Sequence, residues 1–96
     1  MNRATPVPPL PSRPIVLDRL NELAKGQLTR EEAAAWADQW FIADLQPGVD
    51  LEVNDFAVWE ALKSISAADL IATDRPFLYD ETDFAEWAEV LRNAAN

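Results

Sequence analysis

The segment from Thr29 to Ala43 constrains the fold of this chain more than any other part of the sequence. Thr29 and Glu32 have the spacing of a capping box, in which each side chain accepts a hydrogen bond from an otherwise unpaired amide at a helix start. The fourteen residues that begin at Arg30 contain neither glycine nor proline. Their apolar side chains form two neighbouring rows at helical spacing: Ala33, Trp36, Trp40 and Ala43, and Ala34, Ala37, Phe41 and Leu45. The pattern predicts a central helix with a wide buried face.

Three more segments have the apolar spacing of amphipathic helices. The first covers residues 14–25, with Pro14 in its first turn and Gly26 as a C-terminal stop. Asn54 is the expected N-cap of the next, and its inner face carries Val58, Trp59, Leu62 and Ile65. The run Asp80-Glu81-Thr82-Asp83 is expected to cap the last, and its inner face carries Phe84, Trp87, Ala88 and Leu91.

The segment between the last two helices allows two interpretations. Ser66 to Asp69 has the composition of a helix start, which predicts a short helix over residues 67–72. The alternative is a two-stranded hairpin of residues 70–71 and 77–79 around a turn at Asp74–Pro76.

Residues 1–14 hold five of the seven prolines and predict an extended arm with polyproline II geometry. The arm contains Pro8-Pro9-Leu10-Pro11-Ser12-Arg13, which matches a pattern that docks into aromatic grooves, although an arm lying on the domain is the preferred interpretation. Residues 15–96 form one domain. The predicted fold is therefore all-α, a small orthogonal bundle of four to five helices behind a proline-rich extended N-terminal arm.

The absence of cysteine and histidine in the 96 residues excludes thiolate nucleophiles, cysteine-based zinc sites, and the commonest general base. The chain has only two glycines, and neither lies in a phosphate-binding loop. Carboxylates such as Asp80 and Asp83 lie where helix starts favour acids, so capping explains them better than catalysis or metal binding. We expect no enzymatic activity, no metal and no cofactor.

The net charge of −9 comes from 17 acidic and 8 basic residues. Such an excess predicts repulsion from a nucleic-acid duplex and therefore no nucleic-acid partner. It favours a basic protein partner, because complementary charge steers association, although acidity that serves solubility alone is the alternative. The sequence has neither a membrane-length apolar stretch nor a signal peptide, which predicts a cytoplasmic protein without membrane contact.

An acidic face is the predicted partner-binding surface. Its candidate residues are Asp44, Asp50, Glu52, Asp55, Asp83, Glu86 and Glu89. Core packing is the first interpretation for all four tryptophans, but Trp36 and Trp40 lie on a helix that is apolar on more than one side. Trp36 is therefore added as an aromatic anchor, since tryptophan is enriched at interface hot spots.

Three motifs in the order LTREEAAAWADQW, FAVWEALKSISAADL and RPFLYDETDFAEWAEVL carry a resemblance over residues 28–91. With them the chain resembles small acidic all-helical bacterial proteins of unknown function, among them candidate immunity proteins encoded beside polymorphic toxins. The resemblance implies a helical fold and an acidic inhibitor of a basic toxin nuclease, and it does not extend to the proline-rich arm.

Together these observations favour a non-enzymatic protein-binding module, in particular an immunity-type inhibitor of a basic toxin protein. The alternative is a structural or assembly subunit, either a homodimer or a component of a larger complex.

Overall fold

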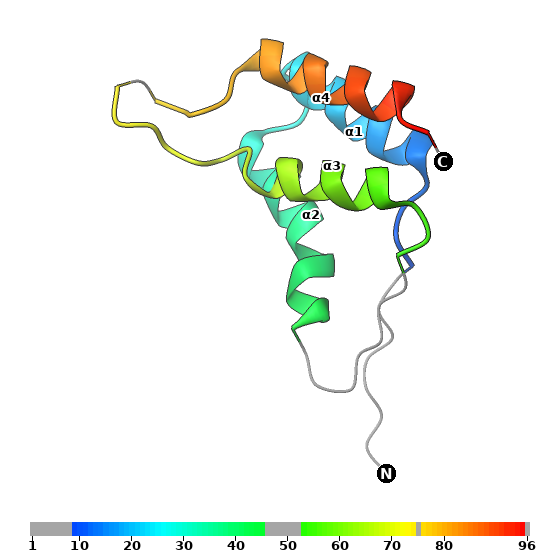
Figure 1. Cartoon of the computed structure of the whole chain (residues 1–96). Coiled ribbons are helices and arrows are strands. Elements are labelled where there is room, and N and C mark those ends of the chain that lie inside the picture. Colours follow the sequence, from blue (N-terminus) through cyan, green and yellow to red (C-terminus); the bar gives the residue numbers. More distant parts are fainter. Residues whose placement is uncertain (1–8, 46–52, 75, 96) are drawn as a thin grey trace.

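The computed structural model describes residues 9–45, 53–74 and 76–95, and these contain four α-helices and no β-strand (Figure 1). The helices are α1 (Arg13–Ala24), α2 (Arg30–Asp44), α3 (Phe56–Ser66) and α4 (Glu81–Asn93). The predicted all-α fold is confirmed, with four helices. Residues 1–8 of the predicted proline-rich arm lie outside the described residues. No helix in the described ranges is both long and apolar enough to cross a membrane.

Helices α1, α3 and α4 run side by side, and α2 leads away from them at a steep angle (Figure 1). α1 packs chiefly against α4, and α2 packs chiefly against α3. The core between them consists of apolar side chains from all four helices. Its largest fully buried members are Phe84, Leu20, Leu62, Ile65, Leu91, Val16 and Val58. α2 adds Ala33, Ala37 and Trp40. The alanine side chains of α2 are small, so they allow its backbone to lie close to the other helices.

Side chains accept hydrogen bonds from backbone amides at the N-terminal ends of α2, α3 and α4. At α2 the Glu32 amide donates to Thr29 Oγ1 at 3.0 Å and the Thr29 amide donates to Glu32 Oε1 at 3.0 Å, which confirms the predicted capping box. Asp80 and Asp83 form the same reciprocal pair at α4. Asp55, not Asn54, is the N-cap of α3, because its carboxylate accepts from the amides of residues 57 and 58.

The sequence predicted both ends of α1 one residue too far toward the C-terminus. The helix begins at Arg13 and ends at Ala24. Gly26 then takes a φ of 75°, a left-handed conformation that glycine adopts without steric cost. The turn at Gly26 connects α1 to α2.

The segment after α3 forms neither of the two predicted structures. Backbone hydrogen bonds of the i→i+3 type at residues 67, 68 and 70 close α3 in tight turns, so the predicted helix over 67–72 is wrong. A backbone hydrogen bond joins the Leu78 amide to the Leu70 carbonyl at 2.9 Å, but the described residues of the expected hairpin form no β-strand. Ile71 is 80% exposed, so a helix here would gain little from packing.

The tryptophans divide between the core and its edge. Trp40 is buried, whereas Trp36, Trp59 and Trp87 are half-buried and pack against the core from outside. Trp87 contacts Phe84 edge-on, with ring centroids 5.3 Å apart. The prediction of a core position for all four therefore holds fully only for Trp40.

Candidate functional site

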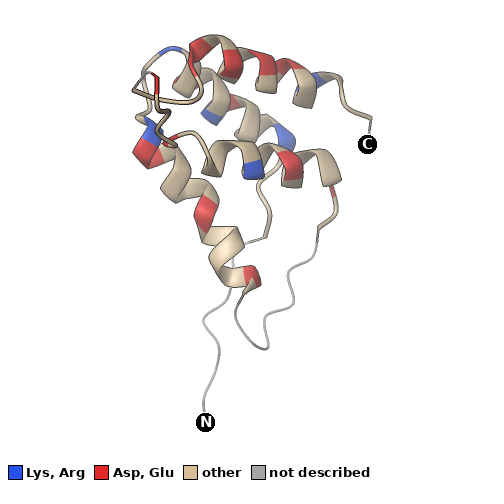
Figure 2. Cartoon of the chain, turned by 60° about the vertical axis from the view of Figure 1, so that its left-hand side comes forward, with Lys and Arg blue, Asp and Glu red and all other residues tan. Residues whose placement is uncertain are grey.

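The acidic residues predicted to form one surface have separate positions and roles. Asp50 and Glu52 lie outside the described residues. Asp44 is exposed at the C-terminal end of α2. Glu86 and Glu89 are exposed on α4, where Glu89 pairs with Arg92 at 2.8 Å. Figure 2 shows acidic residues along both α2 and α4.

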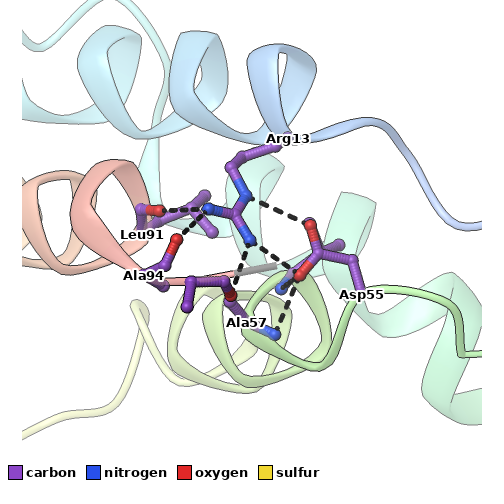
Figure 3. A network of polar contacts seen from close by, with 7 residues as sticks. Arg13, Asp55, Ala57, Leu91 and Ala94 are labelled. Carbon is purple, nitrogen blue, oxygen red and sulfur yellow. Dashed lines mark hydrogen bonds and ion pairs between the residues drawn. The ribbon is translucent and has the colours of Figure 1, made fainter.

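Asp55 and Asp83 are both engaged within the fold. The Asp83 carboxylate is half of the capping box that starts α4. Asp55 caps α3 and also pairs with Arg13, whose Nε and Nη2 donate to its two carboxylate oxygens at 3.1 and 2.9 Å (Figure 3). The hydrogen bonds from Arg13 hold the pKa of the Asp55 carboxyl below its ordinary value. These two carboxylates stabilise helix ends and are not free acids of a surface.

Trp36 is half-buried on α2 and meets Trp40 edge-on, with ring centroids 5.1 Å apart. The Arg19 guanidinium lies 6.0 Å from its ring centroid. Trp36 is thus held by neighbours of its own chain on two sides.

Most basic side chains in the described ranges are bound to other groups of the chain. Ion pairs join Arg13 to Asp55, Arg19 to Glu22, Lys63 to Glu60 and Arg92 to Glu89. Arg30 donates hydrogen bonds to two backbone carbonyls. Lys25 is exposed in the turn after α1, where its backbone amide donates to the Asn21 carbonyl at 3.0 Å. Its side chain has no hydrogen bond, ion pair or ring contact with the described residues.

Arg30 occupies an unusual position at the start of α2. Its guanidinium carbon lies 4.2 Å from the ring centroid of Phe77 and 4.9 Å from that of Phe84. Nη1 donates to the carbonyls of Ala68 and Tyr79. The Nε and Nη2 donors make no hydrogen bond to the described residues. The side chain therefore has a fixed position and retains unused donors.

A pocket of about 280 Å³ adjoins Arg30, between the α1–α2 turn and the start of α4. It is lined by Leu23, Gly26, Leu28, Thr29, Arg30, Glu31, Phe77, Glu81 and Phe84. Lys25 directly precedes one lining residue. The pocket thus combines aromatic rings, a guanidinium and two carboxylates.

A second pocket of about 350 Å³ lies between α3 and α4. It is lined by Ala57, Glu60, Ala61, Ser64, Trp87, Val90 and Leu91, and most of these side chains are apolar. Within the described ranges, no group of three or more acidic side chains could hold a metal ion.

These features define a small all-α protein with acidic residues on its surface and pockets beside its helices. The chain belongs to the family described as YxzC DNA-binding protein, whose model matches residues 12–91. It is 32% identical over 71 residues to the uncharacterized protein YxzC of Bacillus subtilis (strain 168). That alignment covers 74% of this chain and 54% of the relative, so the chain spans about half of the relative's length. No solved structure matches the chain.

The family assignment corrects two predictions. The description of the family as DNA-binding contradicts both the absence of a nucleic-acid partner and the role as a protein-binding inhibitor or assembly subunit. The comparisons support only the coarser part of the resemblance, a small and helical bacterial protein, and not the likeness to immunity proteins. The charge argument failed because a net charge of −9 is a sum over the chain. It does not say which acids cap helices or where a cation remains available.

Sequence reasoning also missed Lys25, Arg30 and Phe77. No motif distinguishes Arg30 from any other basic residue that follows an N-cap. Its contact with Phe77 joins residues that are distant in the sequence, so only the packing of the helices places them together.

Proposed function

We propose that this chain is a non-enzymatic DNA-binding protein. The observation that carries the proposal is the family match, which includes all of α1, α2 and α3 and most of α4. The matched region is therefore the helical bundle itself. DNA binding in a bacterium also implies a cytoplasmic location.

The charge distribution limits how such binding can work. Of the six basic side chains in the described ranges, five already contact other groups of the chain, and the net charge of −9 repels phosphate at longer range. A protein that neutralises 6–10 phosphates loses about 10³–10⁵ in affinity between 50 and 200 mM salt. With two phosphate contacts, one from Lys25 and one from the unused donors of Arg30, the same change in salt should cost this chain only about twelvefold. Weak dependence on salt is thus a signature of the proposed function.

Fluorescence anisotropy with a labelled duplex and a labelled single strand of equal length tests the proposal. We expect saturable binding that unlabelled DNA reverses, measured at 50, 100 and 200 mM salt. The DNA should remain intact by electrophoresis after incubation, as a non-enzymatic role requires. Absence of binding to both DNAs at about 100 µM protein and 50 mM salt, the weak end of non-specific affinity, would refute the function.

A further inference from the structure

We propose that the pocket between the α1–α2 turn and the start of α4 binds a single unpaired nucleotide of DNA. This inference rests on the proposed function and specifies its site and its form of DNA. The site combines an aromatic ring for stacking, unused guanidinium donors and carboxylate acceptors, and Lys25 directly precedes one of its lining residues.

Phe77 supplies the stacking surface, and Arg30 holds this ring in place. The Arg30 guanidinium carbon lies 4.2 Å from the ring centroid of Phe77, and Phe77 itself is half-buried and lines the pocket. Proteins that bind single strands stack bases on aromatic rings and on arginine planes. Hydrogen bonds from Nη1 to the carbonyls of Ala68 and Tyr79 fix the guanidinium. Nε and Nη2 remain to donate to a base or a phosphate.

Lys25 is the cation that we assign to the phosphate of the nucleotide. It is exposed and directly precedes Gly26, which lines the pocket with a φ of 75°. The four basic side chains that form ion pairs in the described ranges would have to give up that contact to bind phosphate. Lys25 binds phosphate without that cost.

Glu31 and Glu81 explain why the ligand is unpaired. Both line the pocket, and their carboxylates can accept hydrogen bonds from the amino groups of a base. In a duplex each of those amino groups gives one of its two hydrogens to the partner base, whereas an unpaired base offers both to the two carboxylates. A duplex would also bring many phosphates against the broad acidic surface at once. At about 280 Å³, the pocket lies near the lower limit of about 300–1,000 Å³ for small-molecule sites, which suits one base.

The test compares the wild-type chain with Lys25→Gln in anisotropy titrations against a labelled single-stranded 12-mer and a fully paired hairpin. We expect the wild type to bind the single strand about tenfold more tightly than the hairpin. Lys25→Gln should weaken single-strand binding about fivefold and reduce the salt slope by about 0.7, the value for one lost phosphate contact. Lys63→Gln is the matched control, because it removes an exposed cation from α3, away from the pocket, and should change affinity less than about twofold.

Phe77→Leu tests stacking separately from charge. It should weaken single-strand binding about tenfold and leave the salt slope unchanged. Circular dichroism checks that the helices persist, since Arg30 contacts this ring. If the variant loses helicity, the Lys25→Gln comparison still decides the matter.

The possible results distinguish a failure of the pocket assignment from a failure of the proposed function. If the wild type binds the hairpin as tightly as the single strand, or if Lys25→Gln and Lys63→Gln behave alike, the pocket assignment is wrong while DNA binding stands. If the wild type binds neither DNA, the proposed function fails, and the site fails with it.

Discussion

Arg13 joins three helix ends through one guanidinium group. In addition to its pair with Asp55, it donates from Nη1 to the carbonyls of Leu91 and Ala94 at 3.2 and 2.6 Å (Figure 3). Carbonyls at a helix C-terminus have no intrahelical partner and favour a cation. Arg13 therefore satisfies the end of α4 while it orients the cap of α3.

Replacement of Arg13 by alanine should lower the free energy of unfolding by about 2–3 kcal/mol, because the half-buried pair is bidentate and the carbonyls lose their donor. Urea denaturation measures this loss. Arg92→Ala is the control, since its pair with Glu89 is exposed and should contribute less than about 0.5 kcal/mol. Equal effects of the two substitutions would contradict the role of Arg13.

Asp55 should make stability depend on pH in acid. Its pKa in the folded state lies below that in the unfolded chain, about 3.9, so its contribution is complete above that value and is lost as the pH falls through the folded pKa. Asp38 acts in the opposite direction, because burial raises its pKa and the nearby charge of Asp69 adds to this effect.

We therefore expect the urea midpoint of the wild type to fall more steeply between pH 5 and pH 2 than that of Asp55→Asn. Asp38 is present in both proteins and cancels from the comparison. Parallel profiles would show that the Arg13–Asp55 pair does not stabilise the fold through the ionised carboxylate.

At the scale of the helix, α4 shows how one apolar stripe divides between the core and its edge. Phe84 is 1% exposed, whereas Trp87, three residues later, is half-buried and covers the core between Tyr79 and Phe84. A shared stripe does not imply equal burial, because the neighbouring helices cover only part of it.

Phe84→Ala should cost about 3–5 kcal/mol, and Trp87→Ala should cost less, even though it removes the larger ring. A fully buried side chain leaves a cavity that the core cannot close, while solvent reaches the site of a half-buried one. Thermal denaturation of both variants decides the order. A larger loss for Trp87→Ala would mean that α4 is rotated about its axis relative to this structure.

At the scale of the whole molecule, the acidic surface and a role in DNA binding oppose one another. Figure 2 shows acidic residues along α4, and Glu86 and Glu89 are exposed there without a part in the core or the caps. In a DNA-binding protein such acids weaken non-specific attraction to phosphate. These acids therefore favour DNA binding through a small site and disfavour binding through a broad surface.

The double substitution Glu86→Gln with Glu89→Gln should leave the free energy of unfolding within about 0.5 kcal/mol. It should strengthen DNA binding a few-fold at 50 mM salt, because two repulsive charges are gone and Arg92 loses its partner. The gain should shrink at 200 mM salt, where the screening length falls to about 7 Å. Weaker DNA binding of the double variant at low salt would contradict this picture.

Local sequence determined the helices of this protein. The capping boxes at Thr29–Glu32 and Asp80–Asp83 were predicted correctly because both partners lie three residues apart, within one helical turn. The apolar spacing likewise predicted four helices and most of the core. The N-cap of α3 was missed by one residue, since adjacent Asn54 and Asp55 are both good caps and the pairing with Arg13 selects the second.

Only the tertiary structure decided which charged side chains are engaged in hydrogen bonds and ion pairs within the chain, and which remain available to a ligand. Arg13 and Asp55 are 42 residues apart, and Arg30 and Tyr79 are 49 apart. No local pattern specifies such pairs, because they form only when the packing of α1 with α4, and of α2 with α3, brings the helix ends together. Composition gives only the number of charges. Packing pairs Asp55 with Arg13, brings Arg30 close to two phenylalanine rings and leaves the Lys25 side chain without a partner among the described residues.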